Sequence, residues 1–276
     1  MSSRFLHHQS QTAMKSSPTV WITGASSGIG KALAHAWSQR GARLLLSARR
    51  EDALHAVREQ CAHPERHHVL PLDLAVPASL HTAVDEATAS HATIDVLINN
   101  GGISQRATAQ DTDMAVVRRI MEVNFFGAVT LTNALLPHLI EQGHGDIGVI
   151  SSIVGTFSTP KRTAYAASKH ALHGYFDGLR AEVYDQGLRV TLICPGYVQT
   201  DVSRNALTAD GTTYGVLSDS IRNGMAPDDC ATAIIRALHE ERDEVYIGGV
   251  ETYMVYLKRF LPPALFNRLI RLVDTT

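Results

Sequence analysis

The sequence is poor in features that would place a protein in certain common classes. Its 276 residues include three cysteines, Cys61, Cys194 and Cys230, which are scattered and odd in number. This argues against a disulfide framework and favours a reducing compartment, so we expect a cytoplasmic protein. The net charge of −2 gives no support to a nucleic-acid partner.

Long apolar runs are also missing. No stretch of about 18 or more apolar residues occurs, so we expect no membrane-spanning helix. Residues 1–17 lack the apolar centre of a signal peptide, and their polar composition predicts a flexible N-terminal extension.

The chain does contain enough apolar sequence for a sizeable core, since 45% of its residues are hydrophobic. Short β-rich runs alternate with longer helical stretches. The runs are 20–22, 43–47, 68–72, 95–99, 147–151, 189–194 and 244–247, and the helical stretches lie near 28–40, 51–61, 77–90, 111–142, 161–186 and 227–240. This alternation predicts an α/β fold, a single Rossmann-like doubly wound domain over 18–250 with a parallel sheet of about seven strands. Ligands are then expected beyond the carboxyl ends of the strands.

A glycine-rich turn, TGASSGIG at 23–30, follows the first predicted strand and opens a helix. Side chains at Gly24, Gly28 or Gly30 would keep the backbone from approaching a pyrophosphate. The start of the helix offers that anion free N–H groups and a partial positive charge. The spacing is not G-x-G-x-x-G, because three residues separate the first two glycines, and a purely structural turn is the alternative.

The end of the second predicted strand bears on the choice of dinucleotide. An acidic residue at this place would bind a ribose diol, but the chain has Ala48, followed by Arg49 and Arg50. A guanidinium can bind a 2′-phosphate in bidentate fashion, so we expect NADP(H) in preference to NAD(H). The alternative is that both arginines are solvated charges at the start of the next helix.

The chain resembles the short-chain dehydrogenase/reductase family over roughly residues 18 to 250. The resemblance rests on TGASSGIG, Asp73 in PLDL, NNGG at 99–102, Asn124 in EVNFFG, SSIVG at 151–155, YAASK at 165–169 and PGYVQT at 195–200. Gly101 departs from the commoner NNAG, which we expect only to loosen that turn. NGGISQRA, ASKHALHGYFDGLRAE and ICPGYVQT are most similar to the branch that contains dehydrogenase/reductase member seven.

Tyr165 and Lys169 are the first candidate catalytic residues. At i and i+4 of a helix they share one face, and an ammonium near a phenol favours the phenolate. Tyr165 is then expected to act as general acid in carbonyl reduction and general base in alcohol oxidation. The resemblance implies that Lys169 also binds the nicotinamide ribose. Taken alone, a Tyr and a Lys at this spacing would more often be structural.

The resemblance implies two further catalytic residues. Ser152, thirteen residues before the tyrosine, is expected to close the fifth strand and donate to the developing oxyanion. Asparagine is unfavourable in a helix interior. The resemblance implies that the helix is kinked at Asn124 and that this residue holds a water for a proton relay through Lys169. The alternatives are a loop cap for Ser152 and a buried asparagine that satisfies a backbone bulge.

The remaining cofactor contacts are carried over by motif. Asp73 is expected at the adenine amino group, Leu74 at the adenine ring, and the three residues from Asn100 at the adenosine ribose. The full expected set is Gly24, Ser26, Ser27, Gly28, Ile29, Gly30, Arg49, Arg50, Asp73, Leu74, Asn100, Gly101, Gly102, Tyr165, Lys169, Pro195, Gly196, Val198 and Thr200.

Two groups of residues have the composition of other kinds of site. CAHPERHH at 61–68 is metal-like, but Pro64 interrupts helical pairing and the run lies in a connection, so no metal is expected. Cys194 has no histidine nearby in sequence, which favours a core thiol over a nucleophile.

Substrate choice is expected to depend on the segments after the sixth strand. The glycine- and threonine-rich segment 199–226 suits a lid. The tail over 251–276 is apolar with interspersed basic residues. It can lie on a membrane surface, cover the substrate cleft or pack on a neighbouring subunit. The pocket is expected to be apolar and its substrate lipophilic.

These observations predict an NADP(H)-dependent oxidoreductase that interconverts a carbonyl and a secondary alcohol. The alternative is a dinucleotide-binding sensor or scaffold without turnover, which would have no need of Asn124, Ser152, Tyr165 and Lys169 together. The expected partners are a small carbonyl or alcohol substrate and further copies of the chain. The resemblance implies a homodimer or homotetramer built through the long fourth and fifth crossover helices.

Overall fold

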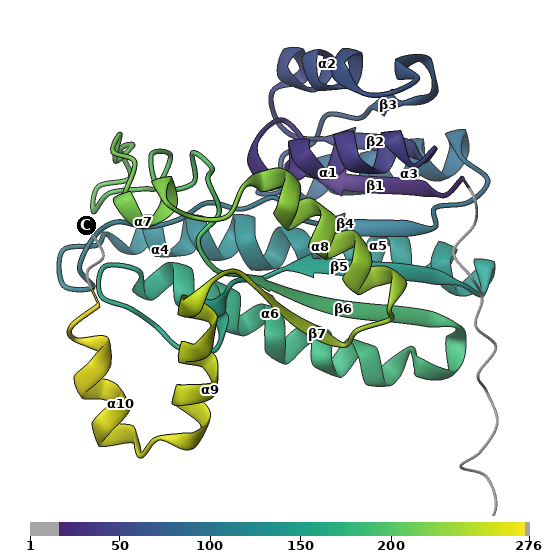
Figure 1. The fold of residues 1–276 in the computed structure, drawn as a ribbon. Coiled ribbons are helices and arrows are strands. Elements are labelled where there is room, and N and C mark those ends of the chain that lie inside the picture. The colour runs from purple at the N-terminus through teal and green to yellow at the C-terminus, as the bar shows by residue number, and fades with distance from the viewer. Residues whose placement is uncertain (1–16, 274–276) are drawn as a thin grey trace, which may run out of the picture.

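The computed structural model describes residues 17–273, so the expected N-terminal extension lies outside the described residues except for Ser17. Seven strands form one parallel sheet in the order β3-β2-β1-β4-β5-β6-β7 (Figure 1). The strands are β1 (Thr19–Thr23), β2 (Arg43–Ser47), β3 (His68–Val69), β4 (Val96–Asn99), β5 (Gly145–Ile150), β6 (Leu188–Pro195) and β7 (Glu244–Ile247). The predicted doubly wound parallel sheet is therefore confirmed.

Helices connect the strands and cover both faces of the sheet. They are α1 (Gly28–Gln39), α2 (Glu51–Gln60), α3 (Pro77–Ser90), α4 (Met114–Met121), α5 (Gly127–Gln142), α6 (Thr163–Glu182), α7 (Asp219–Arg222), α8 (Pro227–His239), α9 (Tyr253–Phe260) and α10 (Pro263–Ile270). The order of the strands reverses between β1 and β4, which is the place where doubly wound folds bind their ligands.

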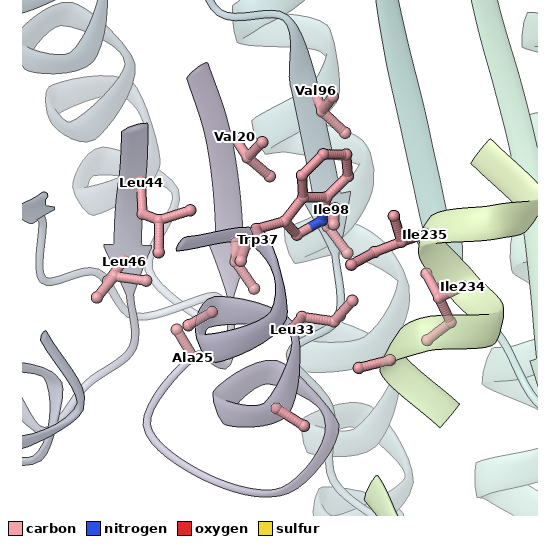
Figure 2. Packing of buried hydrophobic residues seen from close by; sticks show 14 of the residues in the cluster. Val20, Ala25, Leu33, Trp37, Leu44, Leu46, Val96, Ile98, Ile234 and Ile235 are labelled. Carbon is pink, nitrogen blue, oxygen red and sulfur yellow. The ribbon is translucent and has the colours of Figure 1, made fainter. Parts of the chain in front are cut away.

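One face of the sheet packs against α1, α2 and α8. Trp37 of α1 is fully buried and lies among Val20, Ile98 and Ile235, as Figure 2 shows. Burial of large apolar side chains stabilises each by about 1.5–3 kcal/mol relative to exposure. This layer fixes the start of α1 against the end of β1.

The other face packs against α3, α5 and α6, with Leu131 and Phe176 among its fully buried side chains. By length and composition, one helix of the described residues, Met114–Gln142, could cross a membrane, with a mean hydropathy of 1.3. No such helix was expected from the sequence, because this segment contains no continuous apolar run of about 18 residues. Leu131, Leu135 and Leu139 pack in the core beneath the sheet, which accounts for this apolarity.

The structure corrects two element boundaries. The third strand, expected to reach Leu72, ends at Val69. Pro71 is not the cause, because Leu70 and Leu72 on either side of this proline still donate to carbonyls of the second strand and its end. The long helix expected over 111–142 is interrupted at Glu122–Phe126 by a π-helical turn, labelled η2.

The tail folds back onto the domain as α9 and α10. Phe266 and Val255 are buried in a small cluster with Phe157, which follows β5. Figure 1 shows this helical pair and the segment around α7 on the side where the strands end. Both segments therefore lie at the ligand-binding edge of the sheet.

Candidate active site

The glycine-rich turn joins β1 to α1 at the switch point of the sheet. Gly24 and Gly28 adopt φ angles of 66° and 53°, a backbone conformation that would be strained in a residue with a side chain. A Cβ on Gly30 would lie 2.3 Å from the Gly24 carbonyl oxygen. The backbone segments of the turn therefore pack too closely to admit side chains at these positions. The N-terminus of α1 faces the space above the turn.

Polar side chains fasten this turn to the end of β4. The Asn100 side-chain amide donates to the carbonyls of Thr23 and Gly24 at 2.9 and 3.3 Å. The Thr23 hydroxyl accepts from the backbone N–H groups of Asn100 and Gly101 at 2.9 and 3.0 Å. The turn is thus held in place by hydrogen bonds to the segment that follows β4.

A cavity of about 810 Å³ runs along this edge of the sheet. Of the expected cofactor residues, Gly30 is buried beneath the turn and does not line it. The others that line it are Gly24, Ser26, Ser27, Gly28, Ile29, Arg49, Arg50, Asp73, Leu74, Asn100, Gly101, Gly102, Tyr165, Lys169, Pro195, Gly196, Val198 and Thr200.

The lining fits a nicotinamide dinucleotide. The exposed Arg50 guanidinium lies 3.5 Å from the Ser26 hydroxyl, which brings a cation to the glycine-rich turn. Arg49 lines the same cavity. Asp73, also on its wall, receives the Ala75 N–H at 2.9 Å and lies 3.8 Å from Arg119.

Gly101 does more than loosen its turn. A Cβ at this position would lie 2.5 Å from Cδ1 of Leu74. The absence of a side chain therefore lets Leu74 pack over the backbone at the wall of the cavity.

Lys169 lies on α6 with 4% of its surface exposed, and its ammonium donates to the Ile150 carbonyl at 2.7 Å. Burial lowers the pKa of this ammonium to about 8. Its Nζ lies 5.8 Å from the centre of the Tyr165 ring. The two side chains share a helix face, as the i, i+4 spacing predicts.

Asn124 lies in the π-helical turn η2, and 1% of its surface is exposed. Its side chain accepts from the Ile103 N–H at 2.8 Å and donates to the Ile103 carbonyl and the Ser168 hydroxyl, each at 2.9 Å. A Cβ on Gly102 would lie 3.2 Å from Asn124 Oδ1 and 3.7 Å from Lys169 Nζ. Both polar groups therefore border the same small space.

Ser152 lies two residues beyond the end of β5, where it was expected to close the strand, and begins a short 3₁₀ turn. Its hydroxyl accepts from the Val154 N–H at 3.3 Å and donates to the Pro195 carbonyl at 3.4 Å. It lines the cavity beside Tyr165.

The electrostatics of Tyr165 differ from the sequence interpretation. Burial raises the pKa of this phenol, and the effects that oppose the rise come from the Arg162 charge, hydrogen bonding with Ser152 and the Arg106 charge. The cations that favour the phenolate are therefore two arginines, neither of which the sequence interpretation singled out. The sequence KRTAY, with a basic residue three positions before the tyrosine, is the one indication that it offered.

A second cavity, of about 200 Å³, lies beyond Tyr165 and Ser152, which line both cavities. Its apolar wall is made by Ile153, Val154, Phe157, Val202, Ile221, Met254 and Val273. Its position next to the candidate catalytic residues and its mostly apolar wall suit part of a substrate.

Cys194 corrects another expectation, because His173 Nε2 lies 3.6 Å from its sulfur. With Glu244, these residues place three ligand-type atoms within 4.8 Å of one another. His173 also lies 3.0 Å from the Ser151 hydroxyl. Burial, with a contribution from Glu244, raises the pKa of the Cys194 thiol far above its ordinary value, so the thiol stays protonated.

The histidine-rich connection at 61–68 is part of the protein framework. His67 is buried, accepts from the Leu44 N–H at 3.3 Å and lies 2.8 Å from the Ala62 carbonyl. Both of its ring nitrogens therefore have partners in the protein, and burial lowers its pKa. His68 pairs with Glu86 at 3.1 Å on the surface.

The sheet order and the glycine-rich turn at its switch point define a Rossmann-type fold of the kind that binds dinucleotides, and Tyr165 and Lys169 line the cavity beside this turn. The family model for short chain dehydrogenase matches residues 18–211, and the chain belongs to this family. The family binds NAD or NADP, and its members are oxidoreductases that act on small molecules.

Curated relatives and solved structures agree with this assignment. The chain is 41% identical over 254 residues to dehydrogenase/reductase SDR family protein 7-like of Drosophila melanogaster, which covers 90% of this chain and 77% of the relative. It is 42% identical over 257 residues to dehydrogenase/reductase SDR family member 7B of Bos taurus, covering 91% and 79%. This confirms the predicted branch.

Two solved structures show the same fold. A short-chain dehydrogenase from Streptomyces avermitilis has a TM-score of 0.78 and 29% identity, covering 88% of this chain and 94% of that one. A short chain dehydrogenase from Burkholderia cenocepacia in complex with NADP has a TM-score of 0.77 and 26% identity, covering 94% and 98%.

Proposed function

We propose that this protein is an NADP(H)-dependent oxidoreductase that interconverts a carbonyl and a secondary alcohol. The observation that carries the proposal is the meeting of two cavities at Ser152 and Tyr165. The larger cavity has the glycine-rich turn and the cationic side chains that suit a dinucleotide. The smaller one suits a substrate whose carbonyl reaches the tyrosine.

In this proposal Tyr165 provides the proton for reduction. Burial raises the pKa of its phenol, which is therefore protonated at neutral pH and able to act as a general acid toward a carbonyl oxygen. The Ser152 hydroxyl donates a hydrogen bond to the negative charge that develops on the same oxygen. Bound NADPH would supply the hydride for the carbonyl carbon.

Lys169 and Asn124 act next to this tyrosine. The Lys169 ammonium is held at the Ile150 carbonyl and would bind the nicotinamide ribose hydroxyls. The space beside Gly102, bordered by Asn124 Oδ1 and Lys169 Nζ, would hold a water that returns the proton to Tyr165.

The preference for NADP(H) rests on Arg49 and Arg50. Both are exposed at the end of β2 and line the large cavity. Glu51 and Asp52 belong to the first turn of α2, where acidic residues stabilise the helix dipole. The Burkholderia cenocepacia relative is in complex with NADP, which supports the same choice here.

The segment 199–226 would act as a lid over the substrate. It contributes Val202 and Leu207 to the wall of the large cavity, and the Leu207 carbonyl accepts from the Arg106 N–H at 2.8 Å. The apolar side chains of the small cavity favour a lipophilic portion of the substrate.

Two assembly properties belong to the same proposal. Tyr253 and Phe260 on α9 are 66% and 77% exposed beside Lys258 and Arg259, which suits peripheral contact of a cytoplasmic protein with an anionic membrane surface. Phe126 is 48% exposed at the start of α5 and suits a homodimer or homotetramer contact. Sedimentation with anionic vesicles tests the first, and light scattering of Phe126→Glu tests the second.

The decisive experiment measures NADPH oxidation with a panel of ketones. Tyr165→Phe is expected to lower kcat by about 10²–10⁴-fold, because the variant loses its general acid and keeps the ring. Dinucleotide binding, followed by titration calorimetry, should persist. Equal, measurable rates for the parent and the variant would remove Tyr165 from the mechanism, whereas no turnover by the parent with any ketone would favour a scaffold.

A further inference from the structure

Two arginines form the cationic part of the small cavity beyond Tyr165. Arg106 lies in the loop after β4 and is 6% exposed, while Arg162 directly precedes α6 and is half-buried. Both guanidinium groups line the cavity of about 200 Å³. Their charges also act on the Tyr165 phenol, which places them close to the candidate catalytic group.

These guanidinium groups have unpaired donors. Nε and Nη1 of Arg106 and Nε of Arg162 are buried and have no hydrogen-bond partner among the residues that the structure describes. No ion pair joins either residue to a carboxylate within residues 17–273. A buried charge without a partner costs several kcal/mol, so a protein that keeps two of them side by side gains something else from them.

Among the described residues of the cavity wall, one carboxylate occurs, Glu251, and it is already bound elsewhere. Glu251 Oε1 accepts from the backbone N–H groups of Tyr197 and Gly249 at 3.1 and 3.0 Å. Glu251 is not among the charges that shift the pKa of either guanidinium. Burial and the neighbouring Arg162 charge lower the pKa of Arg106 to about 10. Arg106 is therefore still a cation at neutral pH, and the cavity is electropositive.

We infer that Arg106 and Arg162 form an anion subsite, so that the substrate of this enzyme carries a carboxylate or a phosphate group in addition to its carbonyl. The inference rests on the proposed function, since it names the class of carbonyl compound that reaches Tyr165. Planar guanidinium groups bind both anions through paired N–H donors. The apolar side chains of Ile153, Val154 and Phe157 then enclose a hydrocarbon portion.

The expected substrate is accordingly amphiphilic, which sharpens the purely lipophilic expectation from the sequence. The anion would supply the missing acceptors for Nε and Nη1 of Arg106 and Nε of Arg162. A neutral substrate would offer these donors no anionic acceptor. Charged hydrogen bonds of this kind discriminate by about 10- to 100-fold between partners that make them and partners that do not.

Matched pairs of ketones test the inference. One pair is a medium-chain keto acid and its methyl ester, and the other is a ketone phosphate monoester and the corresponding alcohol. The parent should show kcat/KM at least about tenfold higher for the anionic member of one pair, and the pair that shows it identifies the anion. Arg106→Met and Arg162→Met should each lower that value by about 10- to 100-fold. The loss for the neutral member should be smaller, because that substrate is affected only by the loss of charge near the Tyr165 phenol.

Two comparisons show that a loss comes from the missing guanidinium. Arg106→Lys retains the charge and should recover part of the preference. Arg242→Met removes an exposed arginine that pairs with Glu240 at 3.1 Å, and it should leave both substrates unchanged. Both methionine variants should melt no lower than the parent, because each removes a buried unpaired charge. Equal losses for anionic and neutral substrates would overturn the inference.

A binding measurement separates the inference from the proposed function. Decanoate, decyl phosphate and decanol are titrated calorimetrically into Tyr165→Phe saturated with NADP⁺, and into the same variant carrying Arg162→Met. At least one anion should bind more tightly than decanol, and Arg162→Met should abolish the difference. Equal binding of all three overturns the subsite even where neutral ketones are reduced. Selective anion binding with no Tyr165-dependent turnover would keep the subsite and overturn the proposed function.

Discussion

The two sides of the central cleft are built in opposite ways. On the dinucleotide side, Asn100 and Thr23 fasten the glycine-rich turn to the end of β4, so its shape is set before any ligand arrives. On the substrate side, Arg106 and Arg162 keep buried N–H groups that have no partner in the described part of the chain. The dinucleotide side is a preformed cradle, whereas the guanidinium groups of the substrate side need a ligand to pair with them. An added methyl group can disrupt the cradle, and a change of pH or removal of a side chain can alter the charge.

The largest expected effect is on the preformed shape. Gly30→Ala places a Cβ 2.3 Å from the Gly24 carbonyl oxygen, a backbone atom that cannot move without opening the turn. We expect the free energy of unfolding to fall by about 3 kcal/mol and dinucleotide binding to be lost. Chemical denaturation and titration with NADPH measure both.

Gly178→Ala is the matched control, because it makes the same change inside α6, where an added Cβ meets no atom within 4 Å. Helix propensity alone should then stabilise this variant by up to about 1 kcal/mol. If Gly30→Ala behaved like Gly178→Ala, the turn would not be closed as described.

The second effect concerns Lys169, which lies at the boundary between the two sides. Its folded-state pKa is lowered from 10.5 to about 8 by burial. Between these values the unfolded chain binds a proton that the folded protein does not, so stability due to this group rises with pH from about 8 to 10.5. The shift corresponds to about 3 kcal/mol.

Urea titrations of the parent and Lys169→Met at several pH values test this. The parent's free energy of unfolding should rise by about 3 kcal/mol relative to the variant across that range. Subtraction of the variant's curve removes the other groups that titrate there, such as the Cys194 thiol. A difference that stays constant with pH would show that the buried ammonium is not depressed.

The third effect is on cofactor choice. Arg49 is exposed at the rim of the large cavity, so its contact with a 2′-phosphate is partly screened by solvent. Arg49→Ala should weaken NADPH binding by about tenfold and leave NADH binding unchanged. Titration calorimetry with the two cofactors measures this, and unchanged affinity for both would defeat the NADP(H) assignment.

The smallest effect separates a side-chain clash from a backbone clash on the same side of the cleft. A Cβ at Gly101 would meet Cδ1 of Leu74 at 2.5 Å, and this atom ends a flexible side chain. Gly101→Ala should therefore cost less than about 1 kcal/mol in the free energy of unfolding. A loss as large as that of Gly30→Ala would mean that Leu74 is fixed.

The dinucleotide side was readable from the sequence because its residues are close neighbours in motifs. Gly24, Gly28 and Gly30 lie within one turn, and the i, i+4 spacing of Tyr165 and Lys169 places them on one helix face. Asn124 was recognisable as awkward in a helix, and the structure places it in a π-helical turn.

The substrate side was not readable in the same way. Arg106 and Arg162 are 56 positions apart in the chain (162 − 106), and their proximity depends on how the loop after β4 meets the start of α6. Burial and the lack of a partner are properties of packing, and no local pattern reports them. The sequence did not predict the proximity of His173 to Cys194 for the same reason, because the packing of α6 against β6 brings these two residues together.

The tail described earlier has a consequence for how this enzyme can change. Met254 and Val273 belong to the wall of the small cavity, yet both lie beyond residue 211, where the match to the family model stops. Exchange of this appendage between relatives would resize the compartment for the carbon chain and leave the proton donor and the nucleotide cradle untouched. Selectivity and chemistry can thus be altered independently in this architecture.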